Sequence, residues 1–138
     1  RDRLLVMFKK FILLFFIQLF IANSSISMEK ETTFNKKLFD KAQSEGKVVI
    51  VSSWIKYCSS CASQMKVLNK AKNDGKLFDI KFDNIEYFSF DVTNKDIANL
   101  LNVKFQTTLL IFKNNNEIYR SLGETTEDLI YEALKKSI

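Results

Sequence analysis

The chain has 138 residues, enough for one ordinary domain, with 21 Lys and Arg against 16 Asp and Glu and a formal net charge of +5 at pH 7. Apolar residues make up 46% of the sequence and include 13 Phe, which is sufficient for a hydrophobic core. Histidine and proline are both absent, so Ser-His-Asp triads, Cys-His proteases and His-containing metal sites are excluded. Catalytic chemistry is therefore left to cysteines and carboxylates.

The first 27 residues have the pattern of an export signal. Lys9 and Lys10 precede an apolar run over residues 11–22, and small polar residues follow that run. These small residues favour cleavage after Ser24 or Ser27. The sequence therefore predicts a signal peptide that directs the rest of the chain to the periplasm or to the outside of the cell.

Retention of the same segment as a membrane anchor is the alternative. The apolar run is shorter than the ~20 residues that span a bilayer comfortably, but its flanking residues could lie in the interface. We therefore divide the chain into residues 1–27, a signal peptide or N-terminal membrane anchor, and residues 28–138, a folded domain. Residues 1–24 hold four of the Lys and Arg and one of the acids, which leaves 17 against 15. The remaining lysines are mixed with acids, so no nucleic-acid partner is predicted.

The folded domain is expected to begin with a helix over residues 34–44. Leu38 and Ala42 should lie on its inner face, and Gly46 should end it in a left-handed conformation. Residues 47–54 then form a short β-branched run. A continuous apolar run of this kind is typical of a strand that is buried on both faces of a parallel sheet.

A long helix is expected over residues 58–74, followed by a second strand over residues 85–91. Strand, helix and strand in this order imply a right-handed parallel crossover. The apolar residues of the helix recur at helical spacing and should face the sheet: Ala62, Met65, Leu68 and Ala71.

The second half of the domain is expected to end in an antiparallel pair. Residues 93–96 resemble a capping box and open a short helix, and Asn114 to Asn116 form a hairpin turn between strands 108–112 and 117–122. A last helix opens at Thr125 and should bury Leu129, Ile130, Ala133 and Leu134. The sequence therefore predicts an α/β fold, a central mixed sheet made of a βαβ half and a ββα half and flanked by helices.

Two cysteines, Cys58 and Cys61, stand where the first strand turns into the long helix. Cysteines at positions i and i+3 share one face of a helical turn, so their sulfurs can reach each other. The first lies at the helix N-terminus, where free N–H groups and the helix dipole favour a thiolate. A thiolate attacks disulfides, and a second cysteine resolves the mixed disulfide that forms. The pattern predicts a redox-active dithiol.

Three other interpretations of the two cysteines are weaker. A purely structural disulfide would close too short a loop to constrain the unfolded chain much. Half of a zinc site would need a second C-x-x-C or a histidine, and a Cu(I) site would need a nearby Met or His. We therefore predict no metal and no cofactor other than the redox-active disulfide Cys58–Cys61.

The region around the cysteines resembles the thioredoxin family. Residues 49–61 are similar to that family's strand and its W-x-x-[WY]-C-x-x-C motif. Residues 108–114 are similar to its PTLLLFKNG hairpin, and Gly123 falls where the family keeps a glycine. The resemblance covers the whole mature length and implies a thioredoxin fold. It also implies that Cys58 is the exposed nucleophile and Cys61 the buried resolving thiol.

The resemblance further implies a substrate-binding surface beside the sulfurs. Trp54 and Tyr57 would form its aromatic floor, although ordinary core packing is an alternative for Trp54. The other implied substrate-binding residues are Ser59, Ser60, Gln106 and Thr107. The implied partners are protein thiol and disulfide clients of a monomer, and a membrane electron donor is a further candidate.

Three positions depart from the family pattern. Ser52 replaces a buried acid that moves the proton of the resolving thiol, and Ser59-Ser60 replaces Gly-Pro. Thr107 replaces a cis-proline. Because a cis bond before a non-proline residue costs ~2.5–4 kcal/mol, the Gln106–Thr107 bond is expected to be trans. We expect the loop at Thr107 to swing away and to leave the thiol pair more open.

The sequence therefore predicts an exported thiol–disulfide oxidoreductase that acts on protein thiols through Cys58 and Cys61. The absence of a histidine between the cysteines favours a reductase or an electron-relay module over a strong oxidant. The alternative is a redox-silent module that uses the thioredoxin fold to bind peptides. The missing acid and proline favour that alternative, and the two intact cysteines oppose it.

Overall fold

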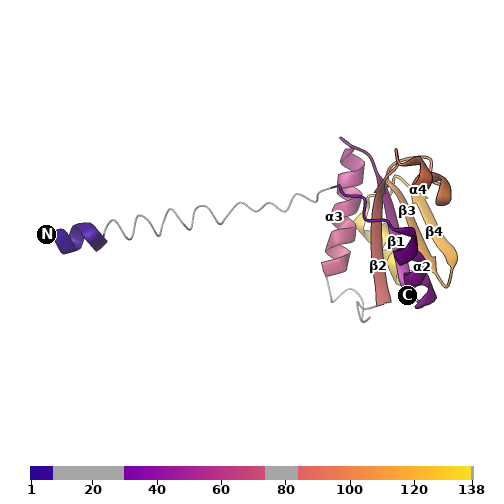
Figure 1. Ribbon diagram of the computed structural model, residues 1–138, viewed down its shortest axis with the longest axis horizontal. Coiled ribbons are helices and arrows are strands. Elements are labelled where there is room, and N and C mark those ends of the chain that lie inside the picture. The colour runs from indigo at the N-terminus through magenta and orange to yellow at the C-terminus, as the bar shows by residue number, and fades with distance from the viewer. Residues whose placement is uncertain (8–29, 74–83, 138) are drawn as a thin grey trace.

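The computed structural model describes residues 1–7, 30–73 and 84–137 of the chain. Most of the predicted export segment, residues 8–27, lies outside the described residues, while residues 2–7 are helical. Within the described residues, no helix is both long enough and apolar enough to cross a membrane. The folded part that the structure describes, from residue 30 onward, is drawn in Figure 1.

The elements follow the predicted order of helix, strand, helix, strand, helix, two strands and helix. The helices are α2 (Lys36–Ser44), α3 (Ser59–Asn73), α4 (Lys95–Leu100) and α5 (Glu127–Ser137). The strands are β1 (Val48–Trp54), β2 (Ile85–Asp91), β3 (Thr108–Lys113) and β4 (Asn116–Leu122).

The four strands form one mixed sheet in the order β2-β1-β3-β4. Strands β1 and β2 are parallel, whereas β3 is antiparallel to both β1 and β4. All seven residues of β1 are buried, as expected for a strand with neighbours on both edges and helices on both faces. The predicted mixed sheet of a βαβ half and a ββα half is therefore confirmed.

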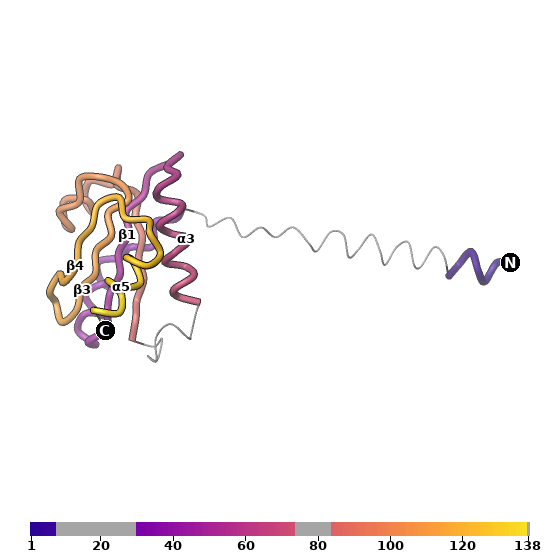
Figure 2. Tube along the Cα trace, turned by 180° about the vertical axis from the view of Figure 1, so that it is seen from behind, coloured from indigo at the N-terminus to yellow at the C-terminus, as the bar shows by residue number. Residues whose placement is uncertain are grey.

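The helices cover the two faces of the sheet in pairs (Figures 1 and 2). Because side chains alternate along a strand, Val49 and Val51 pack on the face of α2 and α4, and Val48 and Ile50 pack on the face of α3 and α5. The α2 and α4 face is rich in aromatic residues, with Phe34, Phe39, Phe88, Phe90 and Phe112 in one cluster.

Three residues expected to face the core point outward instead. Leu38 is 52% exposed and Leu129 is 49% exposed, and Ala62 is also exposed. In α2 the next residue, Phe39, is buried in place of the leucine, and in α5 Tyr131 is buried two residues after the leucine. The larger ring removes more apolar area from water, so it decides how the helix is rotated against the sheet.

The turn residues behave as predicted, with one shift at α4. Gly46 has a φ of 72°, and Asn114 and Asn115 have φ values of 51° and 63° in the hairpin between β3 and β4. The N-cap of α4 is Asn94 rather than Thr93, because the Asn94 side chain accepts a hydrogen bond from the N–H of Ile97.

The segment before α2 runs along the outer edge of β2. The N–H groups of Thr33 and Phe34 both donate to the carbonyl of Ser89, and the Ser89 hydroxyl donates to the carbonyl of Glu31. The hydroxyl of Thr32 accepts from the N–H of Asp91. These bonds occupy an edge of the sheet that would otherwise be open. They place Lys30 at the end of the sheet where β1 meets α3.

Candidate functional site: the Cys58–Cys61 redox centre

The two cysteines lie between the end of β1 and the first turn of α3, and their sulfurs form a disulfide. Cys58 is partly exposed, whereas Cys61 has only 1% of its surface exposed. The N–H of Cys61 donates to the Cys58 sulfur at 3.1 Å, a bond that would also stabilise a thiolate on Cys58. The structure thus contains the predicted disulfide, with one sulfur accessible and the other covered.

The two predicted aromatic residues occupy different environments. Trp54 is buried, packs with Cys61 and Met65 against Cys58, and donates its indole N–H to the carbonyl of Glu31 at 3.3 Å. Tyr57 has a φ of 61° and is 91% exposed. Trp54 therefore lies beside the sulfurs as part of the core, and Tyr57 projects into solvent from the turn.

Thr107 faces the disulfide from the start of β3. The chain contains no cis peptide bond among its described residues, so the Gln106–Thr107 bond is trans as expected. The loop does not swing away, however: Thr107 is 2% exposed, and its hydroxyl lies 3.2 Å from the Cys61 sulfur and 3.6 Å from the Cys58 sulfur. The expectation of a more open thiol pair is therefore wrong.

The backbone of Thr107 is held from three sides. Its N–H donates to the carbonyl of Ser53 at 2.8 Å, and its carbonyl accepts from the N–H of Gly123 and the side-chain amide of Gln64. Its φ is 58°, which is unusual for a β-branched residue and costs roughly 1–3 kcal/mol. The surrounding hydrogen bonds maintain this conformation, and both polar groups of the Thr107 backbone are occupied within the chain.

The remaining predicted substrate-binding residues are on the surface. Ser59, Ser60 and Gln106 are all exposed. The hydroxyl of Ser60 lies 3.3 Å from the Cys58 sulfur and 2.9 Å from the hydroxyl of Thr107. Ser60 and Thr107 therefore form a hydroxyl pair that contacts both sulfurs, and their binding of substrate stays a prediction.

The position of the family's buried acid holds a second hydroxyl pair. The Ser52 hydroxyl is 2.6 Å from the phenol oxygen of Tyr87, and Ser52 is fully buried. Burial raises the pKa of Tyr87, and the hydrogen bond with Ser52 lowers it by less. Both groups are therefore neutral at physiological pH, and no charge lies at this position.

Three residues at the site were not predicted from the sequence. The ammonium of Lys30 donates to the carbonyls of Ile55 and Cys58, each at 3.0 Å. Gln64 is fully buried under Thr107, and the Ser53 hydroxyl donates to the carbonyl of Phe105. Gln64 could have been found, because it is a polar residue three positions after Cys61, on the buried face of α3.

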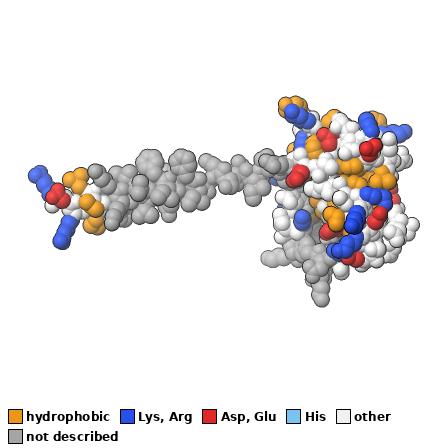
Figure 3. Space-filling view, viewed as in Figure 1, with side chains coloured by type: hydrophobic (Ala, Val, Ile, Leu, Met, Phe, Trp, Pro, Cys, Tyr) orange, Lys and Arg blue, Asp and Glu red, His pale blue; other side chains and the backbone are white. Residues whose placement is uncertain are grey.

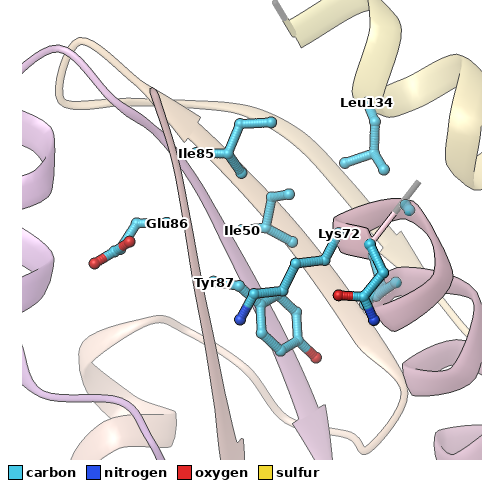
Figure 4. Close-up of a pocket in the computed structure, with 9 residues that line it drawn as sticks. Ile50, Lys72, Ile85, Glu86, Tyr87 and Leu134 are labelled. Carbon is cyan, nitrogen blue, oxygen red and sulfur yellow. The ribbon is translucent and has the colours of Figure 1, made fainter. Parts of the chain in front are cut away.

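A separate cavity of about 360 Å³ lies at the other end of α3, between that helix, β2 and α5 (Figure 4). Ile50, Ile85 and Leu134 supply apolar walls, and Lys72 and Tyr87 reach its side. The cysteines are not part of its lining. Within the described residues, no group of three or more Cys, Asp and Glu could hold a metal ion.

A disulfide between a partly exposed cysteine at a helix N-terminus and a covered cysteine one turn later is the centre of a thiol–disulfide oxidoreductase. The sequence profile of the family described as Thioredoxin matches residues 25–136, and the chain belongs to that family. Proteins of this family act on protein thiols and disulfides without a cofactor, and the redox group here is the chain's own disulfide.

Individual relatives agree with this assignment. The chain is 24% identical to a Thioredoxin H-type of Fagopyrum esculentum over 100 residues, which is 72% of this chain and 79% of the relative. The fold is similar to Trxlp from Edwardsiella tarda EIB202, with a TM-score of 0.65 and 24% identity over 73% of this chain and 94% of the other. Malassezia sympodialis thioredoxin (Mala s 13) gives a TM-score of 0.61 and 21% identity, over 75% and 85%.

Proposed function

We propose that this protein is an exported reductase or electron-relay module that exchanges thiols and disulfides with client proteins. The observation that carries the proposal is the disulfide itself, with Cys58 accessible at the start of α3 and Cys61 covered behind it. Export is supported by the Lys9-Lys10 pair ahead of an apolar run. We place the protein in the periplasm or outside the cell, either free or anchored by residues 1–27.

The reaction consists of two exchanges. The Cys58 thiolate attacks one sulfur of a client disulfide, forms a mixed disulfide and releases the other client sulfur as a thiol. Cys61 then attacks the Cys58 sulfur, forms the Cys58–Cys61 disulfide and releases the second client thiol. The client gains the two electrons and two protons that the Cys58–Cys61 dithiol loses. An external dithiol must then reduce the Cys58–Cys61 disulfide before the next turnover. We propose that a membrane protein supplies this reducing dithiol.

The poise of the dithiol distinguishes a reductase from an oxidant. Equilibrating the domain against glutathione buffers measures its reduction potential, and an insulin-reduction assay measures its turnover. A potential near the ~−270 mV of thioredoxin supports a reductase, whereas a value near ~−120 mV would mark an oxidant and overturn that part of the proposal.

A redox-silent peptide-binding module is the second candidate, favoured by Ser52 in place of the acid and by Thr107 in place of proline. The same insulin assay separates the two. A silent module would bind insulin without catalysing the reduction of its disulfides, and the Cys58→Ala and Cys61→Ala variants would bind it equally well.

Export is tested independently of the redox chemistry. Residues 1–27 are fused to a reporter that is active only outside the cytoplasm, with a matched fusion in which Lys9 and Lys10 are replaced by Glu. Activity of the first fusion and loss of activity in the second support export. A reporter that stays cytoplasmic in both contradicts it.

The proposed monomer is tested by the sedimentation of the folded domain, whose visible surface mixes Lys and Arg with Asp and Glu (Figure 3).

A further inference from the structure

The resolving step needs a proton acceptor that the sequence does not place in the usual position. Before Cys61 can attack the mixed disulfide, its thiol must lose a proton, because the thiolate is the nucleophile. Cys61 is 1% exposed, so bulk water does not reach its sulfur directly. Ser52 stands where the family's acid would be, and its hydroxyl pairs with Tyr87.

A continuous path of hydroxyl groups joins the buried sulfur to the surface. In the described part of the chain, the hydrogen-bonding partner of the Cys61 sulfur is the Thr107 hydroxyl, at 3.2 Å. The next contact, at 2.9 Å, is from Thr107 to the hydroxyl of Ser60. Ser60 is exposed, and its hydroxyl is 3.3 Å from the Cys58 sulfur. The path therefore ends beside the atom from which the client sulfur departs.

We propose that Thr107 and Ser60 form a two-hydroxyl proton relay that deprotonates Cys61 as it resolves the mixed disulfide. The Cys61 thiol passes its proton to the Thr107 hydroxyl oxygen, the Thr107 proton passes to Ser60, and the Ser60 proton passes to the departing client sulfur. A sulfur–sulfur bond forms between Cys61 and Cys58. The bond between Cys58 and the client breaks, and its electron pair leaves with the client as the thiol. Neither hydroxyl is consumed, and no oxidant is needed.

The charged side chains near this path in the described residues have contacts of their own. The Lys30 ammonium is bound to the carbonyls of Ile55 and Cys58, and the Lys56 ammonium lies over the Tyr57 ring at 5.0 Å. On the β4 side, the Glu124 carboxylate accepts from the N–H of Thr126 at 2.6 Å, a bond that lowers its pKa and keeps it ionised.

The conformation of Thr107 also fits a role for its side chain. A β-branched residue at a φ of 58° is strained, and such strain persists only where the surroundings determine it. Ser53 fixes the Thr107 N–H, and Gln64 and Gly123 fix its carbonyl. These bonds come from three separate elements, and together they aim one hydroxyl at both sulfurs.

The test separates attack from resolution by stopped-flow kinetics. Trp54 is the only tryptophan of the chain and packs against Cys61, so its fluorescence follows the disulfide. Reduced protein is mixed with glutathione disulfide. Attack by Cys58 gives a phase whose rate rises with concentration, and resolution by Cys61 gives a phase whose rate does not. The inference rests on this dithiol exchange, so a wild-type protein that shows neither phase refutes the exchange itself rather than the relay alone.

Thr107→Val keeps the branched shape and removes the hydroxyl. We expect it to slow the concentration-independent phase by at least roughly tenfold at neutral pH, by a larger factor than the attack phase, and to move the pH midpoint of the concentration-independent phase upward. Thr107→Ser should restore the rate and the pH midpoint, which a purely structural role of the branched side chain would not do.

Ser60→Ala is the second variant, and it changes an exposed side chain that the fold does not need. It should slow the same phase, whereas Ser63→Ala, an exposed serine on the same helix, should not. If Thr107→Val does not fold, the comparison of Ser60→Ala with Ser63→Ala decides the matter. Resolution at the wild-type rate and pH midpoint in Thr107→Val, or in Ser60→Ala where that variant decides, overturns the relay.

Discussion

The domain has two pairs of hydrogen-bonded hydroxyl groups, Ser60–Thr107 and Ser52–Tyr87, and the two pairs differ in what they touch. The Ser60–Thr107 pair contacts both sulfurs and reaches the surface. The Ser52–Tyr87 pair has a shorter contact of 2.6 Å, and it joins β1 to β2 on the face of the sheet that α3 and α5 cover. The position that carries an acid in the family is therefore neutral here, and the hydroxyl that contacts the buried sulfur, that of Thr107, belongs to the other pair. The four predictions that follow test this division.

Replacing either cysteine should reduce activity most, because the two sulfurs carry out the exchange itself. Cys58→Ala should abolish insulin reduction, because the accessible nucleophile is lost. Cys61→Ser should also abolish turnover, but it should accumulate client proteins as mixed disulfides on Cys58. Non-reducing gels measure both results, and trapping of clients by the Cys58→Ala variant instead would reverse the two roles.

Ser52→Asp places an acid at the buried position that the Ser52 hydroxyl now occupies. Ser52 is fully buried, so an added carboxylate should destabilise the domain by roughly 3 kcal/mol in urea unfolding. In the Thr107→Val background the same acid should raise the resolution rate again, because it offers Cys61 another proton acceptor. Ser52→Asn is the uncharged control, and an equal gain with asparagine would contradict a proton-transfer explanation.

Tyr87→Phe removes one hydroxyl of the Ser52–Tyr87 pair, and it should alter stability without altering exchange. Removing the phenol leaves the Ser52 hydroxyl without its partner and should cost about 1 kcal/mol of unfolding free energy. Burial raises the pKa of Tyr87 in the folded state above its unfolded value of about 10. The stability that its neutral form contributes is therefore complete below pH 10 and is lost as the pH rises beyond that value.

Urea unfolding of wild type and Tyr87→Phe at a series of pH values checks this linkage. The wild-type domain should lose stability above pH 10 more steeply than the variant. The exchange rates of the two proteins at neutral pH should agree within about twofold. A large loss of exchange in Tyr87→Phe would mean that the Ser52–Tyr87 pair takes part in catalysis.

The smallest effect is expected from Lys30, which lies beside Cys58 but touches neither hydroxyl pair. Its ammonium is held at the carbonyl of Cys58, where its charge favours a thiolate on that residue. Lys30→Met should slow alkylation of the reduced protein at neutral pH by about two- to threefold. Lys41→Met, which removes an exposed lysine of α2, is the control. Equal rates for the two variants would show that the Lys30 charge does not act on Cys58.

The order of the elements could be predicted because each one has a hydrophobic period of its own. The rotation of two helices could not. Leu38 and Leu129 fit the apolar stripes of α2 and α5 as well as their aromatic neighbours do. Phe39 packs edge to face on Phe112, with ring centroids 5.0 Å apart, and a contact of this kind with another element is not visible in the local sequence.

The site shows the same limit more clearly. The disulfide follows from the spacing of Cys58 and Cys61 together with their place at the start of a helix, and the trans bond before Thr107 follows from the absence of proline. The direction of the Thr107 side chain does not, because it depends on Ser53 and Gln64, which lie 54 and 43 residues earlier in the chain. Threonine in place of proline, considered by itself, suggested a displaced loop. Hydrogen bonds from distant elements instead keep the loop in place.

The path of residues 30–34 along β2 has a practical consequence for handling the protein. These residues bring Lys30 to the carbonyl of Cys58, whereas α5 ends at Ser137 at the opposite end of the domain (Figure 1). A dye, an affinity tag or a solid support attached ahead of Lys30 would stand next to the sulfurs and compete with large clients for space. The same attachment made after Ser137 would leave the sulfurs facing free solution.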